Sequence, residues 1–102
     1  MTKPTNKNIF QEALKVWGPE KQTMMVFEEM SELQKELCKN MRGAQNKAAI
    51  AEEIADVEIM LEQMVIFHDC AAEVANAKEY KISRLFGRVQ RATCEKTEGW
   101  EA

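Results

Sequence analysis

Apolar residues recur at alternating spacings of four and three in two central segments, and this pattern constrains the fold more than any other feature. The stripe of the first segment comprises Val26, Met30, Leu33 and Leu37, and that of the second Ile50, Ile54, Val57, Leu61 and Met64. Such stripes are typical of helices that pack at a shallow angle. Gly43 lies between them and allows a short connection. The two segments therefore predict an antiparallel helical hairpin.

The remaining sequence also predicts helices, and no strand pattern competes with them. The expected helices are Asn6 to Val16, Pro19 to Met41, a third capped by Asn46 and ending near His68, and Ala71 to Ala92. Thr5 or Asn6 is the expected cap of the first helix, which Gly18 ends. The predicted fold class is all-α, a helical hairpin plus flanking helices. We expect residues 1–94 to form one domain and residues 95–102 to form a flexible tail.

Size, charge and cysteine content narrow the class of protein. A chain of 102 residues buries a modest share of its surface, so we expect a four-helix-bundle-like core completed by oligomerisation. The net charge of -3 comes from interleaved acids and bases, which argues against a nucleic-acid partner. The most apolar stretch, residues 59–67, is too short to span a membrane. The chain has three cysteines and no CxxC pair, which indicates free thiols in a reducing compartment. We therefore expect a cytoplasmic protein.

Two pairs of acidic residues occupy equivalent positions beside the two apolar stripes. Glu29 and Glu32 form one i,i+3 pair, and Glu53 and Asp56 form the other. Residues three apart share a helix face, so packing of the two helices brings the pairs together. Four crowded carboxylates repel one another unless a cation lies between them, and oxygen ligands favour magnesium, manganese or calcium. One such pair means little because Glu is a common helix former, but two matched pairs predict a metal site.

Glu28 and Glu52 precede the two acid pairs directly. They are candidate catalytic residues, as general bases on water or as groups that orient the ligands, and the alternative is that they lie in solvent. The only histidine, His68, is not part of a Glu-x-x-His motif, which excludes the usual di-iron bundle. No Ser-His or Cys-His set is present for a covalent intermediate, so water is the expected nucleophile.

Basic and aromatic residues offer further candidates. Lys81 and Arg84 lie on one face of the fourth helix and are candidates for binding phosphate oxygens, although a solvated basic face explains them too. Trp17 and Tyr80 are weaker candidates for stacking on a nucleobase, and a core position is an equal alternative for each.

Glu28-Glu29-x-x-Glu32-Leu33 followed by Glu53-x-x-Asp56 resembles the signature of the MazG-like, all-α nucleoside triphosphate pyrophosphohydrolases. The likeness extends to Trp17-Gly18 and Gln22, to residues 52–63, and to Lys81 and Arg84-Leu85, and covers roughly residues 9–89. It implies that the two acid pairs bind Mg²⁺, or Mn²⁺ in its place. It also implies hydrolysis of a nucleoside triphosphate to monophosphate and pyrophosphate, phosphate contacts by Lys81 and Arg84, and a homodimer or homotetramer.

Two other hypotheses fit the sequence. A non-catalytic helical oligomer would keep the metal site as a metal- or nucleotide-binding regulatory module, because fold does not fix function. A plain structural coiled coil would bind no metal specifically.

Overall fold

The computed structural model describes residues 2–101, with the side chains of residues 2–96, and every regular element in this part of the chain is a helix. The helices are α1 (Asn6–Trp17), α2 (Pro19–Met41), α3 (Lys47–His68) and α4 (Ala71–Glu101). This order confirms the all-α prediction. The chain divides into two compact units, Met1–Asp69 with α1 to α3 and Cys70–Ala102 with α4.

The ends of α1 and α2 follow directly from local chemistry. The Thr5 hydroxyl accepts a hydrogen bond from the amide of Asn8 at 3.1 Å, and the Asn8 side chain accepts one from the amide of Thr5. This reciprocal cap shows that Thr5, of the two predicted candidates, is the N-cap of α1. Gly18 has φ +88°, a conformation that glycine adopts without strain, and Pro19 then opens α2 at the first helical position.

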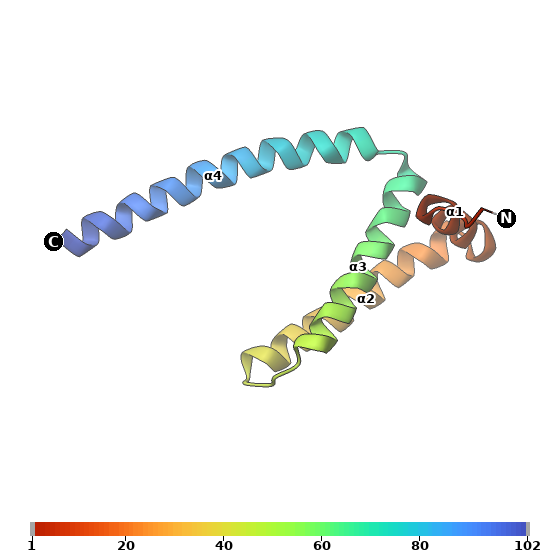
Figure 1. Cartoon of the computed structure of the whole chain (residues 1–102), viewed down its shortest axis with the longest axis horizontal. Coiled ribbons are helices and arrows are strands. Elements are labelled where there is room, and N and C mark those ends of the chain that lie inside the picture. Colours follow the sequence, from red (N-terminus) through yellow and green to blue (C-terminus); the bar gives the residue numbers. More distant parts are fainter. Residues whose placement is uncertain (1, 102) are drawn as a thin grey trace. The chain divides into compact units, whose positions relative to one another are not determined.

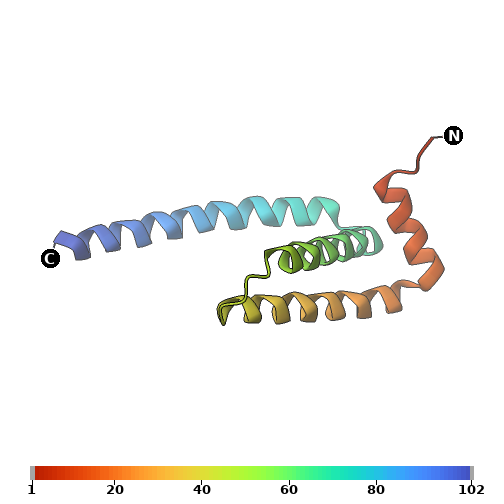
Figure 2. The same cartoon turned by 60° about the horizontal axis from the view of Figure 1, so that its bottom comes forward.

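Helices α2 and α3 form the antiparallel hairpin that the apolar spacing predicts (Figures 1 and 2). The connection includes Gly43 at φ +104°, and α1 packs on both helices at the end of the hairpin away from this connection. Asn46 occupies the N-cap position of α3, as predicted, but its side chain makes no capping hydrogen bond. Asp69 ends α3 in the left-handed conformation with φ +49°.

The hairpin core is narrow. Val26 and Met60 are the buried apolar residues among the described side chains, and Gln22 and Gln63 are buried beside them. Other residues of the predicted stripes are half-buried or exposed, including Leu37 at 43% and Ile54 at 42% exposure. Only one side of each stripe therefore faces a partner helix within this unit.

Helix α4 forms the second unit by itself. It continues to Glu101, beyond the predicted end at Ala92, so its backbone stays helical through most of the predicted tail. Side chains 97–102 and residue 102 lie outside the described part, and the flexibility predicted for residues 95–102 is untested there. No helix among the described residues has both the length and the apolar character needed to cross a membrane.

Candidate metal centre

Three of the four predicted metal ligands converge at the α2–α3 interface. Glu29 of α2 and Glu53 and Asp56 of α3 each present a carboxylate oxygen, and these oxygens lie within 4.8 Å of one another. We call these residues the acidic triad. Two helical residues three apart on α3 meet one from α2, as the matched spacing predicts. Glu29 and Glu53 are half-buried and Asp56 is exposed, so the triad borders the core and remains open to solvent.

The electrostatics of the triad reflect its crowding. Partial burial raises the pKa of Glu29, and the nearby carboxylates of Asp56 and Glu53 raise it further. Burial likewise raises the pKa of Glu53, with Asp56 as the next cause. Because each negative charge disfavours the next, the ionised triad is an arrangement that a cation would stabilise.

The spacing of the triad fits a hard divalent cation. Mg²⁺ and Ca²⁺ bind oxygen at about 2.0–2.6 Å, so two ligands across one ion lie roughly 4–5 Å apart. The triad supplies only carboxylate oxygens, which suit Mg²⁺, Mn²⁺ or Ca²⁺ better than softer metals. Asp56 is exposed, so the triad is accessible from solvent.

The other predicted acidic residues lie around the triad. Glu32 is exposed on α2 and is not among the three converging groups, but its charge contributes to the raised pKa of Glu53. Glu28 and Glu52 are exposed and contribute in the same way to the raised pKa values of Glu29 and Glu53 respectively. All three are therefore available to a ligand from the solvent side.

The predicted phosphate-binding residues belong to the second unit. Lys81 and Arg84 are exposed on α4, and the guanidinium carbon of Arg84 lies 5.9 Å from the centroid of the Tyr80 ring. This distance allows a cation–π contact between two predicted site residues. Tyr80 is 66% exposed, so the alternative of a core position does not hold within its unit.

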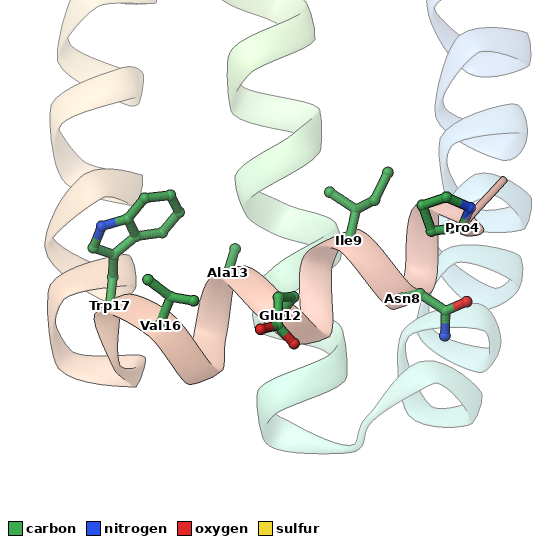
Figure 3. Close-up of a pocket in the computed structure, with 7 residues that line it drawn as sticks. All are labelled: Pro4, Asn8, Ile9, Glu12, Ala13, Val16 and Trp17. Carbon is green, nitrogen blue, oxygen red and sulfur yellow. The ribbon is translucent and has the colours of Figure 1, made fainter.

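Trp17 lies at the end of α1 and is 55% exposed, which also argues against a core position within its unit. Its indole borders a shallow hollow along α1, which is lined by side chains between Pro4 and Trp17 (Figure 3). Trp17 also borders a second hollow of about 310 Å³, which is lined further by Lys21, Gln22, Met25 and Met60. The second hollow matters for the site because Met25 precedes Glu29, and Met60 follows Asp56, by one helical turn.

Two residues of the hairpin differ from what their sequence positions indicate. The sequence predicts that Glu36 is a surface acid, but its side chain is half-buried. It accepts a hydrogen bond from Asn46, and this bond is the main cause of its lowered pKa. His68 continues the apolar stripe of α3, which predicts a core or interface position, yet it is exposed and packs edge-on against Phe67. For Glu36, the sequence signal is its spacing of seven residues from Glu29, which places both on one face of α2.

Comparisons with known proteins add no family assignment. A scan against protein-family models and searches of curated proteins and solved structures found no match to this chain.

Proposed function

We propose that this chain is a MazG-like, Mg²⁺-dependent pyrophosphohydrolase that cleaves nucleoside or deoxynucleoside triphosphates to the monophosphate and pyrophosphate. The observation that carries the proposal is the convergence of Glu29, Glu53 and Asp56 from two helices within 4.8 Å. Glu32 completes the proposed ligand set from the exposed side of α2. Mn²⁺ is expected to substitute for Mg²⁺ because both prefer oxygen ligands.

The chemistry follows from the donor set. Bound Mg²⁺ would neutralise phosphate charge and lower the pKa of a coordinated water. Glu28 and Glu52 are exposed and adjoin Glu29 and Glu53 in the sequence, and one of them is the proposed general base that accepts a proton from the attacking water. Lys81 and Arg84 are the proposed phosphate contacts, since guanidinium and ammonium groups bind phosphate oxygens strongly.

The hollow beside Trp17 supports a nucleotide as the ligand. It lies one helical turn from Glu29 on α2 and from Asp56 on α3, and its lining combines an indole with two methionine side chains. Planar aromatic and apolar surfaces of this kind suit a nucleobase. The triphosphate of the same ligand would then extend toward the triad.

Exposed apolar residues support the proposed homodimer or homotetramer. In the first unit Met24, Phe27 and Met41 are 60%, 59% and 87% exposed, and in the second Ile82 and Phe86 are 64% and 63% exposed. A helix that forms a unit by itself, as α4 does, gains most of its stability from packing of its apolar face, which a second copy would provide.

The test is a panel of nucleoside and deoxynucleoside triphosphates incubated with the protein and Mg²⁺, with detection of pyrophosphate. We expect pyrophosphate from at least one substrate and none after Glu53→Gln, whereas Glu58→Gln, five residues further along α3, keeps activity. A folded, Mg²⁺-binding protein that releases no pyrophosphate favours the regulatory module instead. A protein that binds no metal favours a structural coiled coil.

A further inference from the structure

Polar residues recur across the α2–α3 interface at seven-residue intervals on both sides of the acidic triad. On α2, Gln22 precedes Glu29 by seven residues and Glu36 follows it by seven. On α3 the same interval separates Asn46 from Glu53, and Asp56 from Gln63. Seven residues are two helical turns, or about 10 Å along the axis. The triad therefore lies between two further polar contacts, one toward each end of the hairpin.

The first contact joins two buried amides. The Gln22 Nε2 donates a hydrogen bond of 2.8 Å to the Gln63 Oε1, and the two residues are only 6% and 4% exposed. Their neighbours Val26 and Met60 are the buried apolar residues of the unit. A buried amide left without a partner costs about 1–3 kcal/mol, so sliding α2 along α3 is penalised at this end.

The second contact closes the loop end of the hairpin. The Asn46 Nδ2 donates to the backbone oxygen of Glu36 at 2.9 Å and to its carboxylate at 3.3 Å. The Asn46 Oδ1 accepts from the Asn40 Nδ2 at 3.3 Å. Asn46 thus uses its side chain to join the start of α3 to the body of α2, and not to cap its own helix.

The carboxylates between these contacts repel one another, and that repulsion acts to separate the two helices. We propose that Gln22, Gln63, Asn46 and Glu36 are positioning residues. Their contacts hold α2 and α3 in register, so that the triad stays prearranged for a divalent cation. Single polar contacts inside helix pairs specify register in this way, at some cost in stability. This inference rests on the proposed metal site and adds residues that bind neither metal nor substrate.

The test replaces both amides by a side chain of similar shape. In the variant Gln22→Met with Gln63→Met no buried amide is left unpaired, so we expect a melting temperature equal to or above that of the wild type. Mn²⁺ affinity, measured by electron paramagnetic resonance, should fall by about 10-fold or more, as it does when groups that orient metal ligands are removed. The matched control Gln34→Met changes an exposed residue of α2 and should leave affinity unchanged. A merely structural role predicts the opposite pattern, a lower melting temperature with unchanged affinity, and would overturn the proposal.

A second measurement reads the register without metal. The Thr23 hydroxyl contacts the Met64 sulfur at 3.5 Å, so the two side chains should give a nuclear Overhauser effect in the metal-free protein. Adding Asn46→Ala to the double variant should weaken or abolish this signal. If the wild type binds no Mn²⁺, the proposed function fails, and this signal still decides the inference: persistence at full strength in the combined variant overturns it, and loss supports it.

Discussion

The α2–α3 hairpin and helix α4 carry the same kind of charge pattern in two different settings. Glu29 and Glu32 on α2, like Lys81 and Arg84 on α4, are i,i+3 pairs on helices that also carry apolar stripes. In the hairpin a second helix faces the pair and brings Glu53 and Asp56 beside Glu29. In α4, the only helix of its unit in the described chain, the contact of Arg84 is with its own neighbour Tyr80. Spacing places charges on one face of a helix, but a facing helix is needed to gather them into a cluster such as the acidic triad.

The largest expected effect is on the free energy of unfolding, and it compares side-chain packing in the α2–α3 hairpin with that on α4. Met60→Ala removes a buried side chain of the hairpin and should lower the free energy of unfolding by about 2–5 kcal/mol. Leu85→Ala removes a side chain that is 54% exposed on α4, and should change stability by about 0.5 kcal/mol at most in a monomer. Urea denaturation measures both. A small loss for Met60→Ala contradicts the hairpin core, and a loss for Leu85→Ala that grows with protein concentration indicates that a second copy covers α4.

The second prediction distinguishes Glu29 from Glu32 on α2. Glu29→Gln removes a member of the triad and should lower Mg²⁺-dependent kcat/KM by about 10²-fold or more, since metal-ion stabilisation contributes several kcal/mol. Glu32→Gln changes an exposed acid beside the triad and should cost less. Steady-state pyrophosphate release measures the two variants side by side. An equal or larger loss for Glu32→Gln would mean that the site is centred differently on α2.

The third prediction tests whether α4 takes part in the site. Arg84→Gln should lower kcat/KM by about 10- to 100-fold through loss of a charge-assisted hydrogen bond to phosphate. Arg91→Gln is the matched control, because it makes the same change at an exposed position two turns further along α4. Equal effects of the two variants would assign Arg84 to a solvated basic face.

The smallest effect is the pH dependence of stability without metal. The raised pKa values of Glu29 and Glu53 mean that the folded state binds protons more tightly than the unfolded state, whose carboxyl pKa is near 4.5. Stability should therefore fall as pH rises from 4.5 through the raised folded pKa values. Glu36 acts with the opposite sign, because its lowered pKa makes its contribution fade only as pH falls below 4.5.

Thermal unfolding at several pH values measures this dependence. Glu53→Gln should flatten the decline toward neutral pH, Glu58→Gln should not, and added Mg²⁺ should remove the decline in the wild type. A wild-type protein whose metal-free stability rises steadily from pH 4.5 to neutrality contradicts the crowding of the triad.

The sequence predicted the helices well, because their signals are local. Thr5 and Gly18 determine where α1 begins and ends, Pro19 opens α2, and the spacing of the apolar stripes predicts the hairpin. The meeting of Glu29 with Glu53 and Asp56 follows from the same periodicity.

What the sequence did not reveal depends on contacts between helices. Glu36 and Gln63 look like polar surface residues until the facing helix is known, and Asn46 looks like a simple cap. The end of α4 was placed too early because Thr93 and the polar residues after it weaken the apolar pattern without breaking the helix.

The most direct test of the central claim is a crystal structure of the protein grown with Mn²⁺, with the ion located by its anomalous scattering. The account predicts one strong peak at about 2.0–2.6 Å from a carboxylate oxygen of each of Glu29, Glu53 and Asp56. A well-ordered hairpin with no peak there, or with these three side chains turned apart into solvent, would contradict it.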